Sequence, residues 1–432
     1  MKEIKPRVAV PAGAPSSDQS GRRQFLGRGV KAAGIIAAGG AGVMQASGTA
    51  AQVSGPAWMQ KPGAVSKAYG QPSMFEDKVQ RAWGSGYASV SPGTGASRTP
   101  HQSLNGSITP SGLHFERHHN GVPEIDPAKH ELVIHGMVGR LLVFSVNDLL
   151  RYPMVSRIHF VECAGNSAAN TAPKPPPQDV QAIHGLFSNT EWTGIPLATL
   201  LNEAGVDTKA SWLLAEGADA VAMSRSFPLA KGFDDAMLAL FQNGERIRPE
   251  QGYPMRLLLP GYQGNMNVKW LRRIKVTDEA THTKDETSKY SNLLPDGKAH
   301  QFPFVLDVKS IITHPSGGMT LQGAGLYEIS GLAWSGAGRI VKVEVSADSG
   351  ASWREAAFDN PPLPKAAVRF RLPWDWRGAA AALQSRATDD KGNVQPTRAA
   401  WTALYSAANR YHNNMIQTWA VGANGSVSNV YT

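Results

Sequence analysis

The sequence predicts an α+β protein in which a mixed domain of strands, short helices and long loops is followed by an antiparallel β-sandwich. Three observations lead to this expectation. The chain has 432 residues, which suits two domains and an N-terminal extension better than one compact core. Its 44 glycines and 29 prolines favour turn-rich sheet over helical bundles. From about Phe304, short runs of alternating apolar and charged residues are separated by turns, as in sandwich strands.

The mixed domain is expected to span residues 51–300. Residues 52 to about 110 are rich in glycine, serine and proline and predict an irregular arm, so regular structure is expected to begin near Leu113. A short helix is predicted to start at a capping box, Ser145-Val146-Asn147-Asp148, and to end before Pro153. Strands are also predicted at 132–136, 158–162, 212–215 and 255–259, and a helix at 195–204 that stops at Gly205.

The sandwich is expected to span residues 304–425. Its runs alternate apolar and charged residues, which predicts sheets that each expose one face to solvent. The titratable residues of this region do not cluster, which leaves the chemistry to the mixed domain. The clearest runs are Val341, Val343 and Val345 alternating with Lys342 and Glu344, and Val368, Phe370 and Leu372 alternating with Arg369 and Arg371.

Residues 1–50 predict an export signal. The segment Gly21-Arg22-Arg23-Gln24-Phe25-Leu26 precedes an uncharged, weakly hydrophobic stretch at 32–51, which is the order of a twin-arginine signal. We therefore expect the periplasm as the location; a disordered basic tail is the alternative. Residues 1–50 hold seven Lys/Arg and two Asp/Glu, hence +5 of the net +9, so the remaining +4 argues against nucleic-acid binding. No later apolar run reaches the roughly 18 residues of a membrane span, so the mature protein is expected to be soluble.

The chain contains a single cysteine, Cys163, which excludes an internal disulfide. A lone cysteine is more often a buried thiol that packs as a small apolar group. Here a predicted strand runs directly into it, and small residues follow in Cys163-Ala164-Gly165-Asn166-Ser167, which leaves room beside the sulfur. A thiolate is a soft ligand that a high-valent metal accepts. Zinc and iron–sulfur sites built from several cysteines are excluded, as is covalent haem; a cysteine protease is an alternative.

Basic residues recur in two segments on either side of Cys163. They are Phe115-Glu116-Arg117-His118-His119 and Asn267-Val268-Lys269-Trp270. Arginine and lysine from separate loops are what a pyrophosphate-bearing cofactor requires. Ordinary surface charge is the alternative for each segment taken singly.

Together with further short motifs, these segments resemble the sulfite oxidase family of molybdenum enzymes over nearly all of the chain beyond the export signal. The segment 115–119 is similar to the family's F-x-R-N-H, with His118 in place of the asparagine, and the segment 163–166 to its C-A-G-N. The other matching segments are Glu191-Trp192-Thr193-Gly194, Gln251-Gly252-Tyr253-Pro254-Met255-Arg256, Pro260 to Trp270, Ala333-Trp334-Ser335-Gly336 and Val343-Glu344-Val345-Ser346.

The resemblance implies a molybdenum-molybdopterin cofactor held through the Cys163 thiolate, and no haem in this chain. It implies that Arg117 and Tyr290 orient the substrate and that Trp192 lines its pocket. It also implies that the Ig-like sandwich forms a homodimer within a heterotetramer, and that a separate c-type cytochrome subunit takes the electrons. The residues that it assigns to the pterin are Phe115, Glu116, Arg117, His118, His119, Asp219, Gln251, Arg256, Asn267, Val268 and Lys269.

The sequence departs from the sulfite-oxidising members of the family where those have arginines. It has Ser167, Ala168 and Met266 at these positions. Two unit charges at about 4 Å contribute on the order of 4 kcal/mol at an effective dielectric near ~20, so we expect weaker sulfite binding and a wider pocket. The pattern resembles the sulfane dehydrogenase branch, which oxidises sulfane sulfur on a carrier-protein cysteine during thiosulfate oxidation. In that branch the oxygen comes from water and the electrons pass to the cytochrome.

Three other functions stay open at this point. An exported sulfite dehydrogenase, oxidising free sulfite to sulfate, would turn over sulfite itself. A molybdopterin protein-methionine-sulfoxide reductase generally lacks the C-terminal sandwich. A non-enzymatic adhesion protein fits the C-terminal third alone and would contain no molybdenum.

Overall fold

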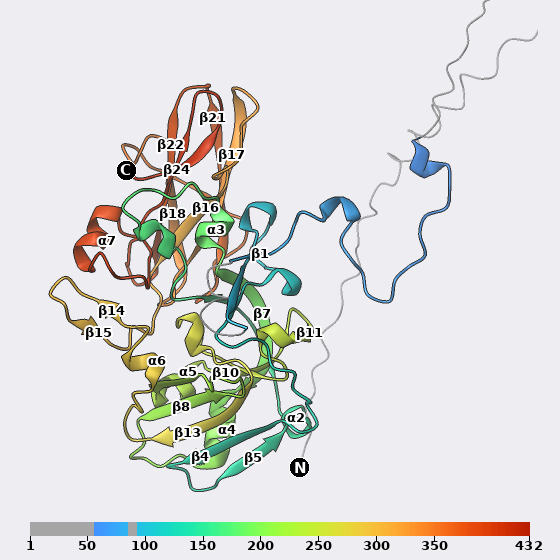
Figure 1. Cartoon of the computed structure of the whole chain (residues 1–432), viewed down its shortest axis with the longest axis vertical. Helices are drawn as coiled ribbons and strands as arrows, with labels where there is room; N and C mark the ends of the chain where they lie inside the picture. The colour runs from blue at the N-terminus through green and yellow to red at the C-terminus, as the bar shows by residue number, and fades with distance from the viewer. Residues whose placement is uncertain (1–55, 85–92) are drawn as a thin grey trace, which may run out of the picture. The chain divides into compact units, whose positions relative to one another are not determined.

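The computed structural model describes residues 56–84 and 93–432 (Figure 1). The chain divides into two compact units, residues 1–71 and 72–432. In the first unit, the described residues 56–71 are exposed and contain one short 3-10 helix, η1 (Ala57–Met59). The export signal predicted for residues 1–50 lies outside the described residues. All of the described sheets belong to the second unit.

Two sheets build the mixed domain. The first has the order β11-β10-β7-β6 with β12 paired to β10, and the second has the order β5-β4-β13-β8-β9, in which β4 and β13 run parallel. Apolar residues of both sheets share one buried core. The strands of the first sheet are β6 (Val155–Glu162), β7 (Phe187–Pro196), β10 (Met237–Gln242), β11 (Glu245–Arg246) and β12 (Arg256–Leu258). Those of the second are β4 (Glu131–Gly136), β5 (Leu142–Ser145), β8 (Trp212–Gly217), β9 (Ser224–Pro228) and β13 (Leu271–Thr277).

Two helices of this domain show how the local sequence sets their ends. The predicted capping box is present at α2 (Val146–Leu149): Ser145 Oγ accepts from the Asp148 backbone N–H at 3.2 Å, and Asp148 Oδ2 accepts from the Ser145 backbone N–H at 3.0 Å. Helix α4 (Leu197–Ala204) ends at Gly205, whose φ of 67° lies in the left-handed region that glycine favours. The prediction that α4 starts at residue 195 is wrong, because the two residues before Leu197 still pair in β7 with β10.

The N-terminal arm contains more regular structure than the sequence predicts. Strand β2 (Gly95–Arg98) pairs antiparallel with β1 (Ala82–Trp83) on one side and β3 (Glu116–His118) on the other. Regular structure therefore begins before Leu113. Small residues in β2 give no apolar alternation, but backbone hydrogen bonds to β3 need none. This three-stranded sheet fixes the segment that carries Arg117.

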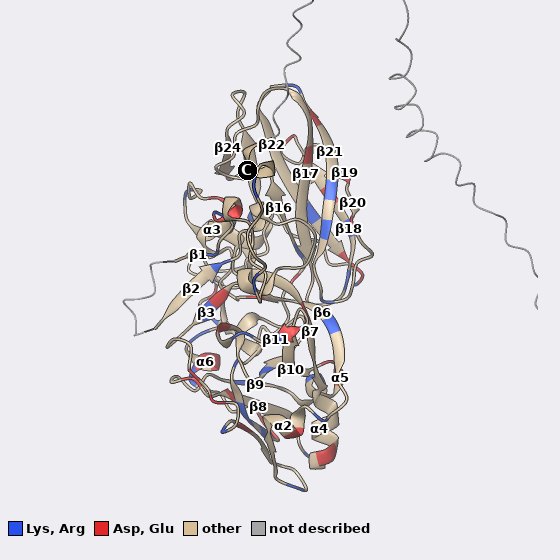
Figure 2. Cartoon of the chain, turned by 90° about the vertical axis from the view of Figure 1, so that its right-hand side faces the viewer, with Lys and Arg blue, Asp and Glu red and all other residues tan. Residues whose placement is uncertain are grey.

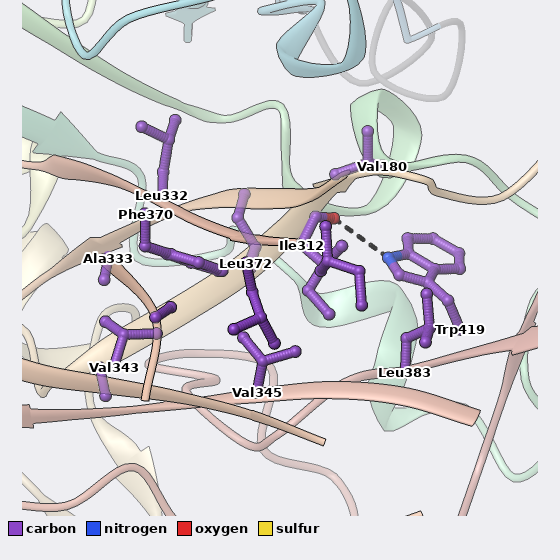
Figure 3. Packing of buried hydrophobic residues seen from close by; sticks show 14 of the residues in the cluster. Val180, Ile312, Leu332, Ala333, Val343, Val345, Phe370, Leu372, Leu383 and Trp419 are labelled. Atoms are coloured by element: carbon purple, nitrogen blue, oxygen red, sulfur yellow. Dashed lines mark hydrogen bonds between the residues drawn. The ribbon is translucent and has the colours of Figure 1, made fainter. Parts of the chain in front are cut away.

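The C-terminal part is the predicted antiparallel sandwich, which confirms the fold class. Its sheets have the orders β16-β17-β21-β20 and β19-β18-β22-β23-β24. Val343 and Val345 of one sheet face Phe370 and Leu372 of the other (Figure 3). The strands are β16 (Lys309–His314), β17 (Gly325–Trp334), β18 (Ile340–Ser346), β19 (Arg354–Glu355), β20 (Ala357–Phe358), β21 (Val368–Trp376), β22 (Ala381–Asp389), β23 (Thr418–Val421) and β24 (Val427–Val430).

Two residues of the sandwich depart from the predicted alternation. Val341 is 45% exposed, because the register of β18 against β22 shifts between Ile340 and Lys342 and places Ile340 in the core instead. Arg369 is only 1% exposed, although its strand position predicts a solvated face. Its guanidinium donates to the carbonyl oxygens of Gly106 and Leu104 and to Thr313 Oγ1, so the N-terminal arm covers this part of the sheet.

The remaining elements are short and connect the sheets. Lys and Arg are interspersed with Asp and Glu along the ribbon of both domains in Figure 2, without a single-sign stripe in that view. Within residues 56–84 and 93–432, no helix has the length and apolar character to cross a membrane. The remaining elements are α3 (Val180–His184), α5 (Leu229–Asp234), α6 (Lys284–Thr287), α7 (Arg398–Leu404), β14 (Asn292–Leu293), β15 (Ala299–His300), η2 (Met74–Glu76), η4 (His101–Ser103), η5 (Ser111–Leu113), η6 (Ala168–Thr171), η7 (Pro249–Gln251) and η8 (Gly264–Met266).

Candidate active site

A cavity in the mixed domain brings together segments far apart in the sequence. All but two of the residues that the sequence predicts for the site line it; the exceptions are Glu116 and Trp192. The predicted residues in its wall are Phe115, Arg117, His118, His119, Cys163, Asp219, Gln251, Arg256, Asn267, Val268, Lys269 and Tyr290.

Cys163 lies where β6 ends and the chain turns. Its backbone N–H donates to Leu186 O at 2.9 Å, and its carbonyl accepts from the Asn166 backbone N–H at 2.8 Å. A β-carbon at Gly264 would lie 2.8 Å from Glu162 O and 3.3 Å from Cys163 Cα, so only glycine allows this loop to pack against the cysteine. Burial raises the pKa of the Cys163 thiol, opposed by the Gly165 backbone N–H and by Arg117. The free thiol is therefore protonated at neutral pH, and a bound metal cation would favour the thiolate.

Two buried cations, Arg256 and Lys269, also line the cavity. Arg256 is 3% exposed and donates from Nη1 to Gln251 O at 3.1 Å and from Nη2 to Asn267 O at 3.0 Å. Lys269 Nζ is 2.8 Å from His118 Nδ1 and donates to Glu250 O at 3.0 Å. Neither cation forms an ion pair with a carboxylate of the described chain.

Both cations have lowered pKa values, and for Lys269 the negative charge of Glu116 and Asp219 opposes the shift without cancelling it. Burial lowers the pKa of Arg256 to about 9. Burial, reinforced by Arg256, lowers the pKa of Lys269 to about 7. A negatively charged ligand in the cavity would reverse both shifts. This part of the wall therefore suits an anionic group such as a phosphate.

Tyr290 and His119 form a polar pair in the cavity. His119 Nε2 is 2.9 Å from the Tyr290 hydroxyl oxygen. Burial raises the pKa of Tyr290 above its usual range, and burial together with Arg117 lowers the pKa of His119 to about 3. Both groups are therefore neutral at pH 7 and share one hydrogen bond along which a proton can move.

Glu116 acts from behind the wall. Its Oε2 lies 2.7 Å from His118 Nε2, and its other oxygen forms an ion pair with Arg81 of the N-terminal arm. Because His118 Nδ1 faces Lys269, Glu116 orients a cavity residue without reaching the cavity itself.

The prediction that Trp192 lines the substrate pocket is not met by the structure. The indole is fully buried in an apolar cluster, and its Nε1 donates to His159 O at 3.3 Å. The guanidinium carbon of Arg256 lies 5.0 Å from the centre of the indole ring. Trp192 therefore packs against the guanidinium of Arg256 in a cation–π contact.

The three positions that lack the family's arginines also lie outside the cavity wall. Ser167 is buried, with its Oγ 2.7 Å from both His184 Nδ1 and Lys309 Nζ. Met266 packs in the apolar core, and Ala168 begins η6. None of these three side chains lines the cavity, and the expectation that the missing arginine charge weakens sulfite binding stays a prediction.

The structure adds several wall residues that the sequence did not single out. His114 precedes the motif at 115–119; its Nδ1 is 2.9 Å from Phe115 O, and burial lowers its pKa to about 3. Asn265 accepts a hydrogen bond from Arg225. Adjacency to the arginine motif could have indicated His114, whereas a loop amide gives no signal of its own. The additional wall residues are His114, Val161, Met223, Gly264, Asn265 and Trp270.

Two protein-family models match the chain. The oxidoreductase molybdopterin binding domain matches residues 119–284, and the Mo-co oxidoreductase dimerisation domain matches residues 301–419. The chain is therefore a molybdopterin oxidoreductase, and it belongs to the sulfite oxidase family.

Individual relatives give finer comparisons. The chain is similar to one from the crystal structure of the sulfane dehydrogenase SoxCD of Paracoccus pantotrophus, with 46% identity and a TM-score of 0.84 over 87% of this chain and 97% of that one. The mitochondrial sulfite oxidase of Mus musculus is 30% identical over 346 residues, 74% of this chain and 63% of that protein. The Homo sapiens enzyme is 32% identical over 333 residues, 71% and 61%. The chain thus spans a little over three fifths of these curated relatives.

The domain match implies a molybdopterin cofactor, and the residues present fit one. Cys163 offers a soft thiolate in the cavity wall, and Arg256 and Lys269 of the same wall offer positive charge to the phosphate. Among the described residues, Arg256 Nε and His114 Nε2 are buried without a hydrogen-bond partner. Buried polar atoms of this kind are usually paired, so they fit contacts to a bound group.

Proposed function

We propose that this chain catalyses the molybdenum-dependent oxidation of a sulfane sulfur attached to a cysteine of a carrier protein. The observation that carries the proposal is 46% identity to a sulfane dehydrogenase chain over 97% of that chain. Identity to the mouse and human sulfite oxidases is lower, at 30% and 32%. The free-sulfite dehydrogenase stays as the second candidate, because those relatives are sulfite oxidases.

Four residues of the cavity wall have separate tasks in this proposal: Cys163, Arg117, Tyr290 and His119. Cys163 holds the metal through its Sγ. When bound, the molybdenum group supplies an acceptor for the two electrons that leave the sulfur, whose new oxygen comes from water. Arg117 attracts the developing negative charge of the oxidised sulfur group. The Tyr290 hydroxyl and His119 Nε2, 2.9 Å apart, hold a proton next to the reacting atoms.

The choice of substrate depends on how many cations of the cavity wall remain for it once the cofactor phosphate is bound. Of the described residues in the cavity wall, the lysines and arginines are Arg117, Arg256 and Lys269. If Arg256 and Lys269 bind the cofactor phosphate, Arg117 is the cation left to face the substrate. A small free dianion needs concentrated positive charge, whereas a sulfur chain on a peptide needs less.

The proposal also covers the partners of the protein and its location in the cell. We infer a homodimer through the sandwich, each protomer carrying one c-type cytochrome subunit that accepts the electrons. The dimerisation-domain match and the two-component SoxCD neighbour support an assembly of this kind. Export to the periplasm by the twin-arginine route rests on Arg22 and Arg23 of the sequence.

Purification from the periplasmic fraction tests the proposal. The protein should contain about one molybdenum atom per chain, co-purify with a haem protein and reduce cytochrome c when given carrier-bound sulfane sulfur. A variant with Lys in place of both Arg22 and Arg23 should remain in the cytoplasm, while the natural sequence is exported. A protein without molybdenum, or one that co-purifies with no haem protein, would contradict the proposal.

A further inference from the structure

Two side chains of the sandwich reach the residue that immediately precedes Cys163. Lys309 Nζ donates to Glu162 Oε1 at 2.8 Å, and Trp334 Nε1 donates to Glu162 Oε2 at 2.7 Å. All three side chains are buried, with exposed fractions of 2% for Lys309, 0% for Trp334 and 4% for Glu162. Both oxygens of this carboxylate are therefore held by the C-terminal domain.

The same ammonium also holds the far end of the cysteine loop. Lys309 Nζ donates to Ser167 Oγ at 2.7 Å, so one side chain connects both ends of the turn that contains Cys163. Within the turn, Asn166 Nδ2 donates to Glu162 Oε1 at 2.9 Å.

The C-terminal segment fixes the backbone of the turn as well. The His412 backbone N–H donates to Ala164 O at 2.9 Å, and Asn413 Nδ2 donates to Ser167 O at 3.2 Å. The loop that presents the thiol is thus anchored to residues of the other domain at Glu162, Ala164 and Ser167.

This arrangement is poorly explained as a device for stability. Removing two charges from water costs several kcal/mol per ion, and apolar replacements of buried ion pairs are often neutral or stabilising. A buried pair with every oxygen hydrogen-bonded does, however, fix geometry, because each hydrogen bond restricts where the carboxylate can lie. A metal site depends on such outer contacts to orient its ligands.

We propose that Lys309 and Trp334 are positioning residues for the metal ligand: through Glu162 and Ser167 they hold the Cys163 thiolate in the orientation that molybdenum needs. The sandwich then completes the metal site as well as serving dimerisation. The inference rests on the part of the proposed function that gives Cys163 to the metal, and it is independent of the substrate.

The first experiment compares two tryptophan variants of the molybdenum-loaded protein. Trp334→Phe removes one hydrogen bond to Glu162 but keeps an aromatic ring against Phe187, whose ring centre lies 3.9 Å from that of Trp334. Trp419→Phe is the matched control, because Trp419 is equally buried in the same domain but donates from Nε1 to Ile312 O at 3.1 Å (Figure 3). The readouts are molybdenum content, the thiolate-to-molybdenum absorption band and the electron paramagnetic resonance of Mo(V) after reduction with dithionite.

The expected result is full molybdenum content in both variants, with a changed absorption band and Mo(V) spectrum in Trp334→Phe alone. Its turnover should fall roughly tenfold, the lower end of the effect of removing contacts behind a metal ligand. Wild-type absorption and Mo(V) spectra in Trp334→Phe, or equal spectral changes in the Trp419→Phe control, would overturn the proposal.

A second variant removes the buried charge. Lys309→Met alone leaves the Glu162 carboxylate unpaired and invites misfolding, so it is combined with Glu162→Gln, which keeps the pair neutral. The double variant should load molybdenum and form dimers by light scattering, yet show altered spectra. Wild-type spectra in the double variant would overturn the proposal. Since none of these readouts uses a sulfur substrate, the sulfane assignment can fail without affecting them.

Discussion

Two buried arginines, one in each domain, show how the cavity differs from the structural core. Arg369 of the sandwich is 1% exposed, and its Nε, Nη1 and Nη2 all donate hydrogen bonds within the chain. Arg256 of the cavity is 3% exposed, but its Nε has no partner among the described residues. A buried donor left unpaired costs about 1–3 kcal/mol. The fold therefore pairs all three nitrogens of the Arg369 guanidinium, whereas it leaves Arg256 Nε available for a contact with a bound group.

The largest expected effect separates the metal ligand from the fold. Cys163→Ser should abolish activity and molybdenum binding, because a hydroxyl is a harder and far less acidic ligand than a thiol. The thermal midpoint of the apoprotein should change little, since the side chains are similar in size. Near-normal turnover by this variant would rule out the metal assignment.

Matched substitutions of the two arginines should affect different properties: cofactor affinity for Arg256 and the stability of the apoprotein for Arg369. Arg256→Met should lower cofactor affinity roughly 10–100-fold but destabilise the apoprotein less than Arg369→Met does: Gln251 O and Asn267 O lose their donors, yet Arg256 Nε has no partner to lose among the described residues. Arg369→Met should destabilise the apoprotein by about 1–3 kcal/mol, because the carbonyls of Leu104 and Gly106 lose their donors. Urea unfolding of both apoproteins and molybdenum quantitation after reconstitution measure the contrast. Equal destabilisation of the two apoproteins would remove the distinction between them.

A smaller effect is expected on anion binding to the cavity, whose affinity should depend on pH through Lys269. Burial and Arg256 lower the pKa of Lys269 to about 7, and a bound anion raises it. Affinity is therefore highest below about pH 7 and falls by at most about tenfold per pH unit above it. Calorimetric titration of the apoprotein with sulfate, which keeps one charge state here, measures the slope. The slope should disappear in Lys269→Gln; an unchanged slope would assign the titration to another group.

The smallest effect tests the shifted register in the sandwich. Val341→Thr should change the unfolding free energy by less than about 0.5 kcal/mol, because the side chain is half-exposed. Val343→Thr should cost about 1–3 kcal/mol, because it buries a hydroxyl in the core. Thermal unfolding of the two variants compares them. Equal losses would place Val341 in the core after all.

The sequence predicted those features that depend on local pattern. The strand before Cys163, the capping box at Ser145 and the alternating sandwich strands are all encoded within a few neighbouring residues. Strand β2 escaped prediction because Gly95 and Ala96 pair through their backbones and show no apolar period.

Long-range contacts could not be predicted in the same way. Trp192 carries a family motif but packs beneath Arg256, and motif spacing does not say on which side of a strand the ring lies. Lys309 contacts Ser167 across 142 residues of sequence, a pairing that only the docking of two domains creates. Of the site, the motif residues were predictable, whereas the sandwich residues that hold the Cys163 loop, such as Lys309, were not.

We propose that the protein oxidises sulfane sulfur on a carrier protein, and one kinetic comparison tests this proposal most directly. The measurement is kcat/KM of the molybdenum-loaded protein for carrier-bound sulfane sulfur and for free sulfite, with cytochrome c as acceptor. We expect a much larger kcat/KM for the carrier-bound substrate, because Arg117 is the wall cation that remains for the substrate when Arg256 and Lys269 bind the cofactor phosphate. Efficient oxidation of sulfite with little or no turnover of the carrier would contradict it in favour of a sulfite dehydrogenase.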